Sequence, residues 1–112
     1  MKGCWYVSEA DLLKAHANKY SDSFEDKASA TAQFAKCADT ELLIVDDFAN
    51  RTEYRQPQID MLARVIGDRL RMARPTILVG RHVGREHPLS WLSSQISQAF
   101  KHGGRIVEVW SD

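Results

Sequence analysis

Residues Leu42–Val45 form a continuous apolar run, Leu-Leu-Ile-Val, that ends in Asp46 and Asp47. A run this short that is apolar at every position has no solvent-facing side, so it fits a strand buried on both faces of a parallel sheet. Such a strand needs neighbouring strands for its backbone groups and other elements to cover its faces. The run therefore predicts an α/β fold.

Short apolar runs and helical periodicities alternate along the rest of the chain. Aromatic and β-branched residues predict three further strands, at 4–7, 76–79 and 105–110. Ser8, followed by the acidic first-turn residues Glu9 and Asp11, has the form of an N-cap with Asp11 at the third helical position, and predicts a helix at 9–20. Helix-forming composition and apolar residues at three- and four-residue spacing predict three more helices, at 25–38, 57–72 and 89–101. The order β-α-α-β-α-β-α-β predicts a parallel four-stranded sheet with helices on both faces.

The chain of 112 residues fits one domain, spanning 1–112, and no linker or internal repeat divides it. Its net charge is zero, but the charges are unevenly distributed. Residues 1–50 hold five Lys and nine acidic residues, a balance of −4, whereas residues 51–112 hold nine Arg, one Lys and six acidic residues, a balance of +4. The Arg-rich half could contact nucleic acid or an acidic protein face, although arginine is also common on solvated helix surfaces.

The two cysteines, Cys4 and Cys37, lie far apart and form no CxxC motif. This usage favours a reducing compartment over a disulfide framework or a zinc site. Acidic residues occur too early for a signal peptide, and no apolar run approaches the roughly 18 residues of a membrane span. A cytoplasmic protein with no membrane partner is expected.

Asp46 and Asp47 at the end of the central strand have the form of a Walker B motif. Open α/β sheets bind ligands at the carboxyl ends of their strands. A first carboxylate there can hold Mg²⁺ and a second can orient the attacking water. The alternative is that both are polar loop residues after an ordinary buried strand.

Four segments carry a resemblance across nearly the whole chain, in order and at matching spacing: Tyr6–Leu13, Glu41–Phe48, Ile66–Val79 and Ile96–Val107. They resemble, in turn, the strand and helix after the P-loop helix, the Walker B strand, the helix and sensor-1 strand, and the end of the core domain in DnaC-type helicase loaders and IstB-type transposition helpers. These families are AAA+ ATPases. The resemblance implies a P-loop NTPase core of the AAA+ type, truncated before its Walker B half.

The sequence departs from that family in three ways. The P-loop signature G-x-x-x-x-G-K-[ST], which cradles the triphosphate, does not occur. The sensor-1 position falls at or next to Arg81, and the arginine-finger position falls near Gln98 and Ala99, neither of which is cationic. We therefore expect no enzymatic activity and no cofactor. Asp46 and Asp47 would be vestigial, and would hold Mg²⁺ with ATP only if another chain supplies a P-loop.

The missing P-loop strand has a geometric consequence. In the AAA+ sheet it lies between the sensor-1 strand and the last strand, which correspond here to Thr76–Val79 and Arg105–Trp110. Its absence leaves a gap that could be closed by direct pairing of these two strands, by a partner's strand, or by dimerisation. Direct pairing or self-association through the sheet edge is favoured.

These observations predict a non-catalytic interaction protein that binds or modulates a replication or transposition ATPase or its partner, such as a helicase or transposase component. One alternative is a fragment or split half of an ATP-dependent helicase loader. The other is a small nucleic-acid-binding protein that uses Arg51, Arg55, Arg81 and Arg85.

Histidines and one further arginine are less distinctive. His82 and His87 could share a metal, but solvated histidines are the favoured interpretation because no ligand with suitable spacing lies nearby. Arg69 is expected to pair or cap locally within its helix. The tryptophans are expected to pack in the core or at its edge.

Overall fold

The computed structural model describes residues 3–80, 87–90 and 108–109. The elements in this part are β1 (Cys4–Ser8), α1 (Glu9–Asn18), α2 (Phe24–Asp39), β2 (Leu42–Phe48), α3 (Gln56–Arg71), β3 (Thr76–Gly80) and β4 (Glu108–Val109). The predicted elements inside this part are confirmed, with small shifts at their ends. The helix predicted at 89–101 lies outside the described residues apart from its first two positions.

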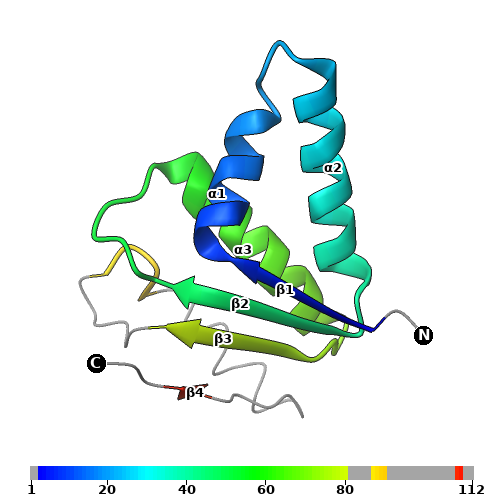
Figure 1. The fold of residues 1–112 in the computed structure, drawn as a ribbon. Helices are drawn as coiled ribbons and strands as arrows, with labels where there is room; N and C mark the ends of the chain where they lie inside the picture. The colour runs from blue at the N-terminus through cyan, green and yellow to red at the C-terminus, as the bar shows by residue number, and fades with distance from the viewer. Residues whose placement is uncertain (1–2, 81–86, 91–107, 110–112) are drawn as a thin grey trace.

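The strands form one parallel sheet in the order β1-β2-β3-β4 (Figure 1). The parallel α/β sheet is thus confirmed, but the described part has three full strands rather than the predicted four. Of the fourth predicted strand, 105–110, the structure describes only Glu108 and Val109, which pair with Leu78 and Val79. This direct pairing of β3 with β4 is one of the two favoured ways of closing the gap that the absent P-loop strand would leave.

The three described helices lie on one face of the sheet (Figure 1), and the fourth predicted helix, 89–101, lies outside the described residues apart from its first two positions. The described helices share this face because of the strand order. The steps from β1 to β2 and from β2 to β3 move in the same direction, and right-handed connections then place their helices on the same side. No described helix is long and apolar enough to cross a membrane.

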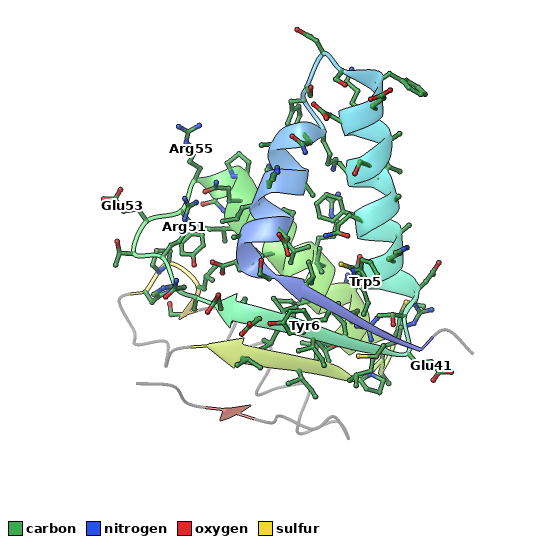
Figure 2. The ribbon with its side chains drawn as sticks, in the orientation of Figure 1. Trp5, Tyr6, Glu41, Arg51, Glu53 and Arg55 are labelled. Carbon is green, nitrogen blue, oxygen red and sulfur yellow. The ribbon has the colours of Figure 1, made fainter. Side chains whose placement is uncertain are left out.

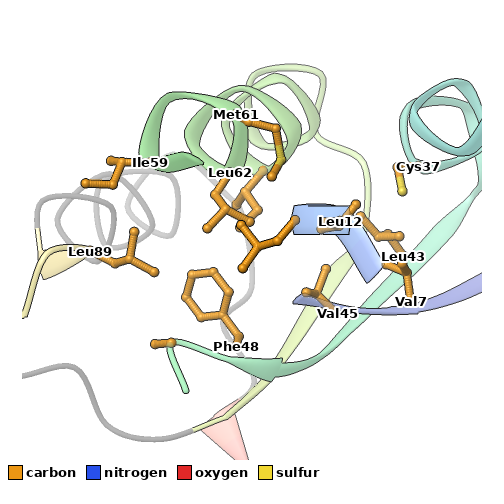
Figure 3. Packing of buried hydrophobic residues seen from close by; sticks show 13 residues of the cluster. Val7, Leu12, Cys37, Leu43, Val45, Phe48, Ile59, Met61, Leu62 and Leu89 are labelled. Atoms are coloured by element: carbon orange, nitrogen blue, oxygen red, sulfur yellow. The ribbon is translucent and has the colours of Figure 1, made fainter. Parts of the chain in front are cut away.

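The core lies between this face of the sheet and the helices (Figure 3). Val7, Leu43 and Val45 point toward the helices, because they alternate with residues that face the other side. Leu12 of α1 and Leu62 of α3 meet them and are fully buried. At about 25 cal/mol per Å² of buried apolar surface, side chains of this kind are the main source of stability.

A capping box starts α1, as predicted. The Ser8 hydroxyl accepts a hydrogen bond from the Asp11 N–H at 3.0 Å, and the Asp11 carboxylate accepts one from the Ser8 N–H at 3.2 Å. This cap fixes where β1 ends and α1 begins, and so places the next residue, Glu9, at the carboxyl end of the sheet.

Arg69 of α3 organises the opposite, amino end of the sheet. Its side chain is 1% exposed and donates hydrogen bonds to one hydroxyl and five backbone carbonyls. The acceptors are Thr76 Oγ1 and the carbonyl oxygens of Cys37, Ala38, Thr40, Glu41 and Pro75, at 2.6 to 3.3 Å. The guanidinium thus caps the C-terminus of α2, where its charge also suits the helix dipole. Arg69 is thus structural, but the prediction of a local role within its own helix is wrong, because it caps α2, 29 to 32 residues away in the sequence.

Candidate functional site

Asp46 lies at the carboxyl end of β2 and is half-buried. Its Oδ2 accepts a hydrogen bond from the Tyr6 hydroxyl, and its Oδ1 accepts one from the Asp47 backbone N–H at 2.9 Å. The hydrogen bond to Asp46 raises the pKa of Tyr6, although that side chain is 60% exposed. Both oxygens of Asp46 are therefore already engaged by groups of the chain itself.

Asp47 follows in a different geometry. Its φ of 54° lies in the left-handed region, and the pairing of β2 with β3 is irregular between Val45 and Phe48. Beyond the irregularity, Phe48 pairs with Gly80, and a Cβ at Gly80 would lie 2.0 Å from the Phe48 carbonyl oxygen. The strand therefore bends at this point, and Asp47 is exposed while Asp46 stays on the sheet.

Glu9 is the most buried carboxylate beside this bend, with 2% of its surface exposed. It accepts a hydrogen bond from the Ala49 N–H at 3.0 Å and bonds from the Tyr54 hydroxyl at 2.9 and 3.0 Å. Burial raises the pKa of Glu9, and the hydrogen bonds from Ala49 and Tyr54 only partly oppose this effect. Glu9 therefore ties the N-terminus of α1 to the β2–α3 loop, residues 49–55.

Sequence reasoning treated Glu9 only as an acidic residue in the first turn of a helix. Its partner Tyr54 lies 45 residues away, so no local pattern indicates the pairing. Tyr54 is itself held by burial, which raises its pKa, and by the Arg51 backbone N–H, which donates to its hydroxyl at 3.2 Å.

His87 closes the same loop from the other side. Its Nε2 lies 2.8 Å from the Arg51 carbonyl oxygen, and its Nδ1 accepts the Leu89 N–H at 3.0 Å. With Nδ1 accepting this bond, Nε2 is the ring nitrogen that can donate to the Arg51 carbonyl. Its ring also packs edge-on against Tyr54, with centroids 5.7 Å apart. The prediction of a solvated His87 is wrong, because the ring is held by the loop; His82 lies outside the described residues.

A hollow of about 380 Å³ opens between α1, the bend and the start of α3. It is lined by Glu9, Ala10, Leu13, Lys14, Asp47, Asn50, Arg51 and Gln58. Its charged side chains are two cations and two carboxylates, so its formal charges cancel. A triphosphate needs a surplus of positive charge, whereas this lining suits a polar or zwitterionic group, such as side chains of a protein partner.

The structure separates the predicted site residues. Asp47 and Arg51 meet at the hollow, but Asp46 is not part of its lining. Arg55 is exposed just before α3, and Figure 2 shows it on the same loop as Arg51. Arg81 and Arg85 lie outside the described residues.

The Walker B carboxylates do not form a metal site with other described residues. Within 3–80, 87–90 and 108–109, no group of three or more His, Cys, Asp or Glu side chains could hold a metal ion. The two oxygens of Asp46 already accept protein hydrogen bonds. Carboxylate oxygens that are already hydrogen-bonded in this way do not fit a Mg²⁺ ion held by the chain alone.

Comparison with known proteins relates the fold to the AAA+ ATPases. No protein-family model matches the chain, and no curated protein sequence matches it. Among solved structures, the chain is similar to AMPPCP-bound DnaA from Aquifex aeolicus, with a TM-score of 0.61 and 19% identity. The match covers 98% of this chain and 32% of DnaA. The chain therefore has an α/β fold similar to about a third of an AAA+ protein.

Proposed function

We propose that this chain is a non-catalytic interaction protein derived from a DnaC- or IstB-like AAA+ core, which binds and modulates a replication or transposition ATPase. The observation that carries this proposal is the direct pairing of β3 with β4. In the family that the sequence resembles, the P-loop strand stands between these two strands. A strand supplied by another chain would have to break the pairs of Leu78 with Glu108 and of Val79 with Val109. The pairing thus favours an interaction role over a split ATPase.

The state of the Walker B aspartates supports the same proposal. Asp46 is engaged by Tyr6 and by its own neighbour, and Asp47 turns away into a hollow whose charges cancel. Among the described residues, neither carboxylate belongs to a group of three or more side chains that could hold a metal ion. Their present contacts are those of structural residues.

The connection between α1 and α2 offers a surface for such a partner. The two helices project away from the sheet (Figure 1), and Tyr20 and Phe24 at their joined ends are 75% and 84% exposed. Single exposed apolar residues are common, but two large aromatics on one projecting tip are suited to insertion into a partner's apolar groove.

The proposal is tested by adding the purified chain to a DnaC- or IstB-type ATPase from the same host and measuring the rate of ATP hydrolysis. The rate is expected to change saturably at near-stoichiometric amounts. The double variant Y20A/F24A should lose the effect, whereas Met72→Ala, which removes an apolar side chain that is 62% exposed elsewhere, should retain it. An unchanged rate together with no detectable complex would contradict the proposal.

The nucleic-acid alternative makes a different prediction. Arg51 and Arg55 are both exposed on the β2–α3 loop, with Glu53 between them. Binding of DNA or RNA through such residues would weaken steeply with salt and would be reduced in R51A/R55A. The proposed interaction role expects no salt-sensitive binding of a mixed-sequence oligonucleotide.

A further inference from the structure

The outer edge of β1 exposes a set of backbone groups that can be assigned from the register. The Gly3 carbonyl accepts the Leu42 N–H at 3.2 Å, so the backbone groups of Gly3, Trp5 and Val7 point toward β2. Those of Cys4 and Tyr6 therefore point away from the sheet. No described strand pairs with this side of β1, which is the end of the sheet.

This edge lacks the features that normally protect an edge strand. Natural proteins guard such edges with Lys, Pro, a bulge or a covering segment. The sequence of β1, Cys-Trp-Tyr-Val-Ser, has no charge and no proline, and its pairing with β2 runs without irregularity from Cys4 to Ser8. Its residues have high strand propensity. Cys4 is exposed and Tyr6 is 60% exposed on the face opposite the helices.

We propose that β1 pairs antiparallel with β1 of a second copy of this chain, about a two-fold axis that passes beside Trp5. In this register Cys4 of each copy lies opposite Tyr6 of the other. Each such pair exchanges two backbone hydrogen bonds, which gives four across the interface and continues the sheet through both copies.

The contacts at the end of β1 select this register. The Ser8 N–H already donates to the Asp11 carboxylate in the capping box, so Ser8 cannot donate to a further strand. An axis beside Tyr6 would place Cys4 opposite Ser8 and lose those bonds. Only the axis beside Trp5 uses every available donor and acceptor of Cys4 and Tyr6.

A second copy fits this edge better than an unrelated strand for two reasons. The edge is self-complementary, because the donors and acceptors of Cys4 meet those of Tyr6 when the strand is rotated onto itself. The two Trp5 side chains would face each other at a non-hydrogen-bonded position, where aromatic pairs are favourable. The net charge of zero also gives no overall repulsion between copies. This inference does not depend on the proposed function.

Sedimentation equilibrium of the reduced chain over a range of concentrations provides the first test. The wild-type chain is expected to be in monomer–dimer equilibrium. Tyr6→Pro removes no backbone bond to β2, but it removes the outward N–H together with the phenol that donates to Asp46. It should weaken the dimer by about tenfold or more, since two interface hydrogen bonds are lost. Tyr6→Phe keeps the N–H and should leave the dimer unchanged. A wild-type chain that stays monomeric at all concentrations would overturn the proposal, as would a dimer that Tyr6→Pro does not weaken although it folds.

Disulfide formation tests the register itself and does not depend on the proline variant. Opposed residues of an antiparallel pair have Cα atoms about 5.5 Å apart, within the range that a disulfide bridges. The variant Tyr6→Cys should therefore form a covalent dimer with Cys4 of the second copy under mild oxidation. The two Cys4 residues of the wild-type dimer would lie about 8 Å apart, so the wild-type chain should not cross-link. Equal cross-linking of both proteins, or of neither, would overturn the register.

Discussion

The two ends of the sheet both contain a buried charged side chain, but they use it differently. At the amino end, Arg69 makes six hydrogen bonds, five to main-chain carbonyls and one to a threonine hydroxyl. At the carboxyl end, Glu9 makes its bonds to one N–H and one tyrosine hydroxyl beside an open hollow. The first end holds the fold together, whereas the second holds a loop in place next to solvent.

This difference shows how to interpret the acidic residues at the carboxyl end. A catalytic metal site leaves carboxylate oxygens available for the ion and its waters. Asp46 instead accepts hydrogen bonds from the Tyr6 hydroxyl and the Asp47 N–H. The Glu9 carboxylate accepts hydrogen bonds from the Ala49 N–H and the Tyr54 hydroxyl. The carboxyl end therefore combines hydrogen-bonded carboxylates with an accessible hollow.

The largest effect is expected at the amino end. Arg69→Ala would leave the buried acceptors of Cys37 and Thr40 without the guanidinium donor and would remove four partly buried bonds, and should lower the free energy of unfolding by about 3–5 kcal/mol. Arg64→Ala, at an exposed position of the same helix, should change it by less than about 0.5 kcal/mol. Chemical denaturation of both variants provides the comparison. Similar stability losses in the two would mean that Arg69 is not the organising residue.

The next effect concerns the bend that separates Asp46 from Asp47. Gly80→Ala places a Cβ 2.0 Å from the Phe48 carbonyl oxygen, so the β2–β3 pairing must shift. We expect a loss of about 2–3 kcal/mol in thermal or chemical unfolding. Gly3→Ala, where φ is +69° but nothing lies within 4 Å, should lose only about 1 kcal/mol. A larger loss of stability in Gly3→Ala than in Gly80→Ala would show that small backbone shifts readily relieve the close approach of the Phe48 carbonyl to residue 80.

Glu9 provides the third prediction, which includes a pH dependence. Glu9→Ala leaves the Ala49 N–H and Tyr54 hydroxyl unpaired and should lower the free energy of unfolding by about 1–2 kcal/mol. Burial raises the pKa of Glu9 above its ordinary 4.5, so the folded chain retains a proton that the unfolded chain loses. The stability of the wild-type chain should therefore fall as the pH rises from about 4.5 through the raised pKa.

Denaturation of Glu9→Gln across the same pH range is the control. The amide keeps an acceptor oxygen but cannot titrate, so this part of the pH dependence should be absent. If the stability of Glu9→Gln depends on pH as strongly as that of the wild-type chain, groups other than Glu9 cause the pH dependence.

The smallest effect is expected at the Walker B aspartate. Tyr6→Phe removes the hydroxyl that donates to Asp46 from a largely exposed side chain. Its unfolding midpoint should be indistinguishable from that of the wild-type chain, because solvent replaces the lost bond. A spectrophotometric titration should find the pKa of Tyr6 above the ordinary value of a tyrosine, and Asp46→Asn should largely remove this shift. An unshifted Tyr6 in the wild-type chain would show that its hydroxyl is not bonded to Asp46.

The sequence predicted the elements well because their signals are local. The apolar run Leu42–Val45 and the Ser8–Asp11 cap are visible within a few residues, and both occur in the structure as predicted. Strand order, and the face on which the described helices lie, depend on how connections cross the sheet, which no local pattern contains.

The candidate site was only partly predictable for the same reason. Asp47 and Arg51 were both identified as candidates, but their meeting at one hollow depends on the left-handed turn at Asp47. The role of Glu9 depends on Tyr54, which only the tertiary fold brings near. Long-range polar pairs of this kind leave no periodicity in the sequence.

Nucleotide binding to the isolated chain tests the central claim most directly. Isothermal titration with ATP and with ADP, each in the presence of Mg²⁺, should give no saturable heat, and Asp46→Asn should behave as the wild-type chain does. Tight Mg²⁺–ATP binding by the wild-type chain that Asp46→Asn abolishes would contradict the account, because it would mean that the Walker B aspartate still binds a metal–nucleotide complex.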